Sequence, residues 1–152
     1  MDVNVKSCYI LARTFYNKLK NSRGSIVVIG SVHGVASSRD ISMYAISKSA
    51  LHGLVRNLAI EWGGDKILVN GVAPGAIDTP MLMSGLSRNR DMTPLQAYER
   101  LESRHITSRV GHPTDVAELV YFLGDRTSNR NITGQMIVCD GGASIYLSTE
   151  VS

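Results

Sequence analysis

Residues 25–48 read SIVVIGSVHGVASSRDISMYAISK, and this stretch decides the fold class. Its opening apolar run, which ends at Gly30-Ser31, predicts a buried strand over about 25–31. A small and polar loop covers 32–41. A helix is predicted from about 42 to 62, because apolar and small residues recur at helical spacing until Gly63-Gly64 ends it.

Tyr44 and Lys48 lie four residues apart in the predicted helix 42–62, so they can share one face. An ammonium held near a phenol favours the phenolate, which a tyrosine needs to act as a general acid or base. Ser31 ends the strand that faces this helix and can aim its hydroxyl at the same carbonyl oxygen. The less specific interpretation remains open: a packed ring beside a solvated amine, with Ser31 as a turn residue.

Two further apolar runs predict strands, at 67–72 and at about 135–139. The first leads into a Pro-Gly loop over 70–80, and the second is followed by Asp140-Gly141-Gly142. Glycine just past a strand end allows a sharp turn or a close approach to a ligand. Strands separated by helical segments predict an α/β fold with a doubly wound parallel sheet.

The remaining segments are predicted to be helical. Residues 2–20 form an amphipathic helix, and a second helix runs from Val116 to about Leu123. Thr79-Pro80 is a helix start, with threonine as the cap. Residues 80–106 carry many apolar side chains, which predicts a flexible, helical substrate lid within a single domain over 1–152.

The chain resembles the carboxyl-terminal portion of the short-chain dehydrogenase/reductase family, from Val3 to about Gly142. The matching pieces are Asn4 in Met1-Asp2-Val3-Asn4-Val5, Ser31, Tyr44-Ala45-Ile46-Ser47-Lys48, Pro74-Gly75-Ala76-Ile77-Asp78-Thr79, Arg109-Val110-Gly111-His112-Pro113-Thr114-Asp115-Val116-Ala117, Ile132-Thr133-Gly134-Gln135 and Asp140-Gly141-Gly142.

The resemblance implies an incomplete Rossmann-like sheet, made of the last three strands of seven and their helices. The family's Gly-rich phosphate turn and its Asn-Asn-Ala-Gly segment have no counterpart here. By resemblance, roughly the first third to two-fifths of the usual subunit lies outside this sequence, and we expect the 152-residue chain alone to be inactive.

The resemblance also assigns roles to residues. Tyr44 would be the general acid or base, and Ser31 would donate to the substrate oxygen. Lys48 would stabilise the Tyr44 anion and bind the nicotinamide ribose, and Asn4 would hold a water in a proton relay. From the sequence without the family, helix capping is the favoured role for Asn4.

Further residues are expected to meet the cofactor, NAD or NADP, beside Tyr44 and Lys48. These are Pro74, Gly75, Ile77 and Thr79. Asn70 is expected to tie their turn together. Asp140 is favoured as a structural residue that bonds backbone amides in the last turn.

Composition argues against several classes of partner and site. The net charge is +3 with scattered Lys and Arg, so no nucleic-acid partner is expected. No apolar run reaches the ~20 residues of a membrane span, and no signal peptide is visible. Cys8 and Cys139 lie far apart and the histidines are isolated, so we expect no disulfide, no metal site and a reducing, cytoplasmic location.

Two functions from different classes follow. The favoured one is an oxidoreductase that transfers a hydride between NAD(P) and a ketone or secondary alcohol; a 3-oxoacyl thioester, with Arg88 and Arg90 meeting a carrier, is the alternative substrate. The other is a non-catalytic assembly piece. In the family, the helices expected here at 2–20 and 42–62 pair across subunits, which implies a homodimer or homotetramer.

Overall fold

A sheet of three parallel strands, in the order β1-β2-β3, forms the centre of the protein in a computed structural model that describes residues 1–88 and 91–145. The strands are β1 (Ser25–Ile29), β2 (Leu68–Pro74) and β3 (Met136–Cys139). In the register, Val72 of β2 lies between Ile29 and Ile137. The predicted parallel α/β sheet is confirmed.

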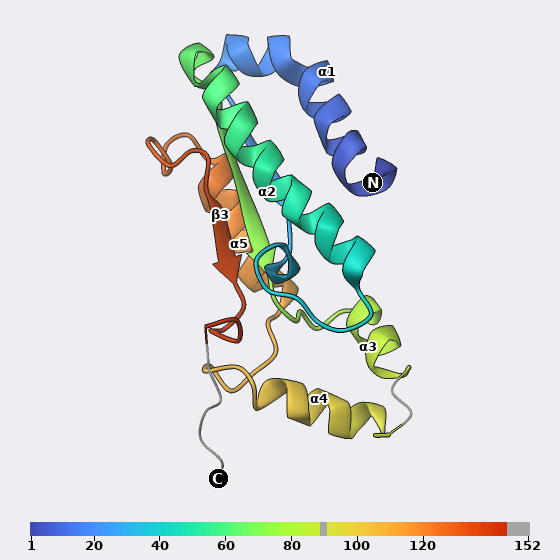
Figure 1. The fold of residues 1–152 in the computed structure, drawn as a ribbon. Helices are drawn as coiled ribbons and strands as arrows, with labels where there is room; N and C mark the ends of the chain where they lie inside the picture. Colours follow the sequence, from blue (N-terminus) through green and yellow to red (C-terminus); the bar gives the residue numbers. More distant parts are fainter. Residues whose placement is uncertain (89–90, 146–152) are drawn as a thin grey trace.

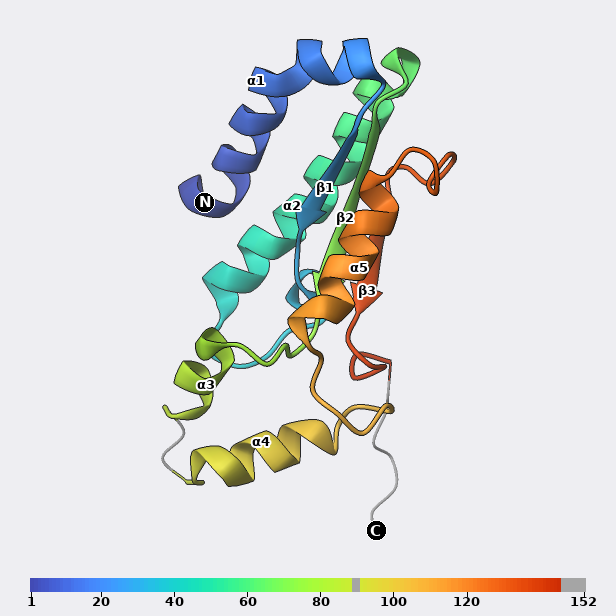
Figure 2. The same ribbon diagram turned by 180° about the vertical axis from the view of Figure 1, so that it is seen from behind.

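Helices cover both faces of this sheet. On one face lie α1 (Ser7–Ser22), which continues from the π-helical turn η1 (Asp2–Lys6), and α2 (Ser42–Trp62) (Figure 1). On the opposite face lies α5 (Pro113–Gly124) (Figure 2). None of the helices among the described residues is both long and apolar enough to cross a membrane.

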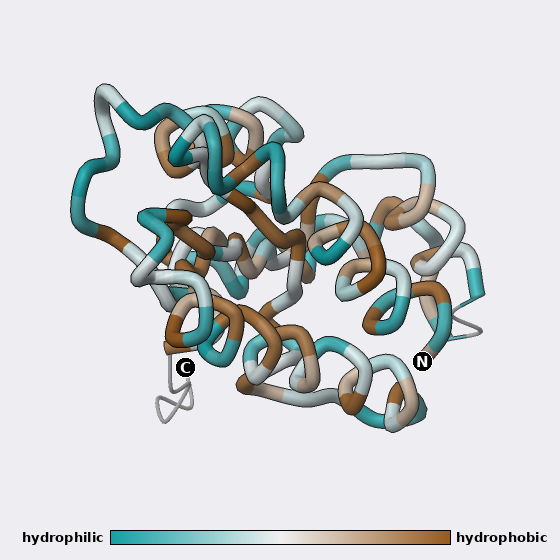
Figure 3. Tube along the Cα trace, turned by 90° about the horizontal axis from the view of Figure 1, so that it is seen from above, coloured by the Kyte–Doolittle hydropathy of each residue, from teal (hydrophilic) through white to brown (hydrophobic). Residues whose placement is uncertain are grey.

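The core lies between α2 and the central strand. Leu51, Val55 and Leu58 of α2 are fully buried, as are Val69 and Val72 of β2. The tube coloured by residue hydropathy accordingly shows hydrophobic residues through the middle of the molecule (Figure 3). Because β2 has a helix on each face, its side chains are buried on both sides, which explains its continuous apolar run.

The lid region consists of two short helices, α3 (Pro80–Leu86) and α4 (Pro94–Glu102), rather than one helical stretch over 80–106. Thr79 caps α3, as predicted, since its Oγ accepts a hydrogen bond from the Leu82 N–H at 3.3 Å. A second threonine–proline pair, Thr93-Pro94, starts α4 with a capping box. That second start signal divides the segment.

Other boundaries shift by a few residues. The first strand ends at Ile29 and not at residue 31, because the chain then enters the 3-10 turn η2 (Val32–Gly34). Another 3-10 turn, η3 (Gly63–Asp65), follows α2 at the predicted Gly63-Gly64 stop. The central strand extends to Pro74.

Candidate active site

The ends of the parallel strands place the candidate residues on one edge of the sheet. Parallel strands present all their carboxyl ends on the same side, which is where ligands bind in open α/β sheets. The turn η2, the loop after β2 and the lid helices all gather there (Figure 1). Ser31, the segment Pro74–Thr79 and Asp140 therefore share this edge.

Tyr44 and Lys48 lie on one face of the first turns of α2. The Lys48 Nζ is 5.7 Å from the centroid of the Tyr44 ring, and Tyr44 is 42% exposed. The amine also donates a hydrogen bond of 3.1 Å to the carbonyl of Ile29, at the end of β1. This contact ties the helix face that carries the Tyr–Lys pair to the strand that precedes Ser31.

Ser31 is buried and sits just past the strand end. Its Oγ accepts a hydrogen bond of 3.2 Å from the His33 N–H, so the hydroxyl acts as the cap of η2. A serine oxygen that only accepts keeps its own proton free to donate. The His33 ring stands edge-on to Tyr44, with 6.0 Å between the centroids, and links the serine turn to the tyrosine.

Asn4 lies inside η1 and does not cap it. The residue before this turn is Met1, which makes no side-chain capping bond. The Asn4 Nδ2 instead donates to the Ser47 Oγ at 3.0 Å, and that hydroxyl donates to the Tyr44 carbonyl at 2.7 Å. The capping interpretation is therefore wrong, because the helix begins two residues before Asn4 and leaves its side chain free to reach α2.

The loop after β2 is held against the last strand. The Gly75 N–H donates to the Cys139 carbonyl at 3.0 Å, and a Cβ at Gly75 would lie 2.6 Å from that of Asp140. Only glycine fits this approach. Ile77 pairs with Gly111 in a bridge, and the Thr79 hydroxyl donates to the Ile77 carbonyl at 3.1 Å. Pro74, at the end of β2, leads directly into this fixed loop.

Asp140 has the structural role that was predicted for it. Its carboxylate accepts hydrogen bonds from the Gly142 N–H at 2.9 Å and the Ser144 N–H at 2.7 Å. Burial opposes the charged form, but these bonds outweigh it and lower the pKa of Asp140. Asn70 was expected to tie the Pro-Gly turn together, but its side chain bonds the Ile132 carbonyl and the Gln135 N–H. It therefore holds β2 to the segment before β3.

All four histidines have specific contacts that sequence reasoning missed. The buried His105 has its Nδ1 2.8 Å from the Leu101 carbonyl. His112 caps α5 through a capping box with Asp115. His33 donates its backbone N–H to the Ser31 Oγ, and the His52 ring lies against Gly34 of the same turn. The signal for His112 was its position directly before Pro113, the first residue of the helix. No sequence signal could place His52 beside Ser31, since that contact depends on how α2 packs against the strand end.

The described residues hold no cluster of His, Cys, Asp or Glu arranged to bind a metal ion. Cys8 and Cys139 are both free thiols. A cavity of about 290 Å³ lies between η2 and α2 and is lined by His33, Gly34, Ala45 and Ser49 among others. Tyr44 and Lys48 do not line it, so it is adjacent to the Tyr–Lys pair and separate from it.

Comparison with known proteins places this arrangement in a family. The family model described as enoyl-(acyl carrier protein) reductase matches residues 1–144. A tropinone reductase homologue of Arabidopsis thaliana is 39% identical over 146 residues, which are 95% of this chain and 51% of that protein. The chain thus spans about half the length of the curated relatives that it matches.

Solved structures also match nearly the whole chain. Ligand-free aldohexose dehydrogenase of Thermoplasma acidophilum is 29% identical with a TM-score of 0.90, covering 98% of this chain and 59% of that one. ElxO with NADP bound has a TM-score of 0.81 at 28% identity, over 94% of this chain and 56% of that one. A 4-hydroxyisoleucine dehydrogenase complexed with NADH is 32% identical with a TM-score of 0.75, over 96% of this chain and 58% of that one. Together with the match over nearly all residues, these likenesses show that the chain belongs to the short-chain dehydrogenase/reductase family, whose members are oxidoreductases.

Proposed function

We propose that this chain carries the catalytic half of an oxidoreductase that transfers a hydride between NAD(P) and a ketone or secondary alcohol. The observation that carries the proposal is the Lys48 amine, 5.7 Å from the ring of a half-exposed Tyr44 at the carboxyl edge of the sheet. A phenol that is buried away from solvent could not reach a substrate, whereas Tyr44 is open to one.

In the reducing direction, Tyr44 gives its hydroxyl proton to the carbonyl oxygen of the substrate. Lys48 stabilises the phenolate that remains. Ser31 keeps its proton and donates a hydrogen bond to the same oxygen, where negative charge develops as the carbonyl carbon is reduced. In the oxidising direction the phenolate takes the proton from the alcohol, so one residue serves as acid and as base.

The residues present fit a nicotinamide cofactor, which when bound supplies or accepts the hydride. Lys48 has three ammonium protons and uses one on the Ile29 carbonyl, so two remain for ribose hydroxyl oxygens. Pro74, Gly75, Ile77 and Thr79 form a loop whose backbone is fixed by β3 and Gly111. Asn4 would hold a water in the proposed proton relay behind Lys48, while its bond to Ser47, which donates to the Tyr44 backbone carbonyl, fixes Asn4 against α2.

The substrate is proposed to be a small carbonyl or alcohol compound that meets the apolar side of the lid. Met81 and Leu95 are strongly exposed on α3 and α4. The 3-oxoacyl thioester remains the alternative substrate, and the acyl carrier named in the matching family model supports it. Of its two proposed carrier contacts, Arg88 precedes the undescribed pair 89–90, and Arg90 lies outside the described residues.

Both free thiols fit a reducing compartment such as the cytoplasm.

The test measures oxidation of reduced nicotinamide cofactors with a panel of ketones and one 3-oxoacyl thioester. Two proteins are assayed: the 152-residue chain, and a fused protein in which the unmatched part of the Arabidopsis homologue precedes it. We expect turnover from the fused protein alone. Tyr44→Phe should lower it at least about 100-fold, because the proton donor is lost.

Tyr121→Phe is the matched control, since Tyr121 is 74% exposed on α5 at the opposite face of the sheet. It should leave turnover within about twofold of the parent. Full turnover in Tyr44→Phe would show that Tyr44 is not the acid or base.

Assembly is a second candidate function, favoured by apolar side chains on the outer helices. Ile10, Leu11 and Phe15 of α1 are about half exposed, as is Ile46 of α2. We propose that these helices pair between copies, as a homodimer or homotetramer. Light scattering with a nicotinamide titration separates the two candidates, because a chain that associates and ignores the cofactor supports assembly alone.

A further inference from the structure

Three side chains of helix α2 contact the segment around Ser31. Lys48 donates to the carbonyl of Ile29 at 3.1 Å, and the Ser49 hydroxyl donates to that of Gly34 at 3.0 Å. The His52 ring lies against Gly34 in the same turn, with the Ser31 backbone near enough to favour its protonated form. His52 lies one turn after Lys48, so Lys48 and His52 reach the strand end from neighbouring positions on the helix.

The His52 ring is buried. Only 7% of the residue is exposed, and Nε2 has no hydrogen-bond partner. Burial lowers the pKa of His52, and the charge of Arg56 lowers it further, while the Ser31 backbone acts in the opposite direction. Because Nε2 faces Gly34 and has no partner, we infer that the ring proton is on Nδ1, on the side of the Ser31 backbone.

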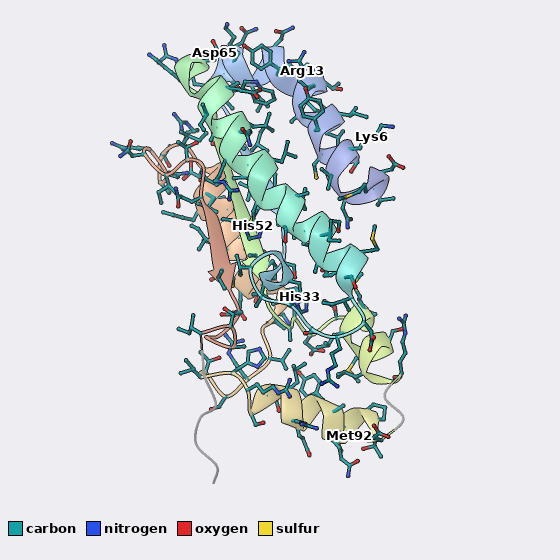
Figure 4. All side chains as sticks on the ribbon, in the orientation of Figure 1. Lys6, Arg13, His33, His52, Asp65 and Met92 are labelled. Carbon is teal, nitrogen blue, oxygen red and sulfur yellow. The ribbon has the colours of Figure 1, made fainter. Side chains whose placement is uncertain are left out.

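The other side of the ring fixes the turn that follows Ser31. A Cβ built on Gly34 would lie 2.2 Å from His52 Nε2, and its three nearest atoms would all belong to this ring. The ring therefore occupies the space that a side chain at position 34 would need. Figure 4 labels His52 on α2 and His33 on η2, close to the carboxyl edge of the sheet.

We propose that His52 is a positioning residue that aims the Ser31 hydroxyl at the substrate oxygen, an inference that rests on the proposed function. By packing against Gly34 and lying beside the Ser31 backbone, the ring sets the extended backbone of Ser31. That backbone fixes where Oγ points and lets it accept the His33 N–H. Catalytic donors lose their effect when they are displaced, because their stabilisation depends on preset geometry.

The experiment uses His52→Leu, which removes the donor, and His52→Asn, whose amide N–H can replace it. Asn57→Leu on the same helix is the control, since the Asn57 side chain bonds Gly53 within α2. In the 152-residue chain, hydrogen exchange of the His33 amide reports the turn without any substrate. We expect His52→Leu to speed that exchange about tenfold and His52→Asn to keep it within about threefold.

In the fused protein, His52→Leu should lower kcat about tenfold with KM within about twofold, because a displaced donor affects the transition state most. His52→Asn should restore kcat. In a Ser31→Ala background, His52→Leu should cost nothing more, because the group that it positions is gone. Asn57→Leu should change neither exchange nor kcat.

Unchanged His33 exchange in His52→Leu would overturn the proposal, as would losses that add to those of Ser31→Ala. If His52→Leu fails to fold, His52→Asn decides: loss of both protection and kcat in that variant overturns it. If the unsubstituted fused protein has no turnover, the proposed function fails, while the exchange measurement still decides whether His52 holds the turn.

Discussion

At the residue scale, the spacing of Tyr44 and Lys48 was enough to predict that they are neighbours. Both lie on one helix, so their separation follows from helical geometry alone. The bonds of Lys48 to Ile29 and of Asn4 to Ser47 were not predictable, because each joins segments that are far apart in the sequence. Local patterns determine which residues share a face, and tertiary packing determines what that face contacts.

Asp115 should make the stability of this chain depend on pH in the acidic range. The Arg109 guanidinium, with hydrogen bonds of 2.7 and 3.1 Å, and the His112 N–H lower the pKa of Asp115 from 3.8 to about 2. A lowered pKa in the folded state means that the stabilisation is complete above 3.8 and is lost as the pH falls from there toward about 2.

Urea denaturation at a series of pH values measures this effect. Asp115→Asn should be less stable than the parent at neutral pH and should lose less stability on acidification. Glu118→Gln, at an exposed position on the same helix, is the control and should keep the slope of the parent. Identical slopes for Asp115→Asn and the parent would contradict the prediction.

At the element scale, helix α2 was predicted with its observed bounds, because a long periodic segment ends at two glycines. The division of the lid into α3 and α4 was missed, although Thr93-Pro94 repeats the start signal of Thr79-Pro80. The end of β1 was placed two residues late. Strand pairing, and not local composition, decides where a strand stops.

Removal of the α3 cap should destabilise the start of the lid. Thr79→Ala loses the bonds to the Leu82 N–H and the Ile77 carbonyl, which should cost about 1 kcal/mol. Thr79→Ser keeps an oxygen at the same place and should lose less than about half of that. Chemical denaturation gives the free energies of unfolding, and faster amide exchange at Leu82 would locate the loss. Equal stability of the Ala and Ser variants would show that the cap contributes nothing.

At the scale of the whole molecule, the parallel direction of the strands was predicted because helical segments separate them. Among the described residues, β1 pairs only with β2, so its outer side is a free edge, as the incomplete Rossmann sheet implied. Long-range contacts such as the Gly75–Asp140 approach could not be predicted in detail, since they depend on how two loops from distant strands meet.

Self-association through the outer helices is the expected behaviour of the 152-residue chain. Phe15 on α1 is 48% exposed, and Ile46 and Ile60 on α2 are 50% and 80% exposed, so both helices leave large apolar side chains in water. Burying these side chains against a second copy removes apolar area from solvent. Phe15→Glu should therefore shift light-scattering mass toward the monomer by placing a charge in the contact.

Tyr121→Glu gives the matched control, because it introduces the same charge at a position that is 74% exposed on the opposite face. It should leave the association unchanged, while both variants keep the denaturation midpoint of the parent. If the chain associates through the free edge of β1 instead, Phe15→Glu will have no effect, since edge pairing uses backbone groups that this substitution leaves intact.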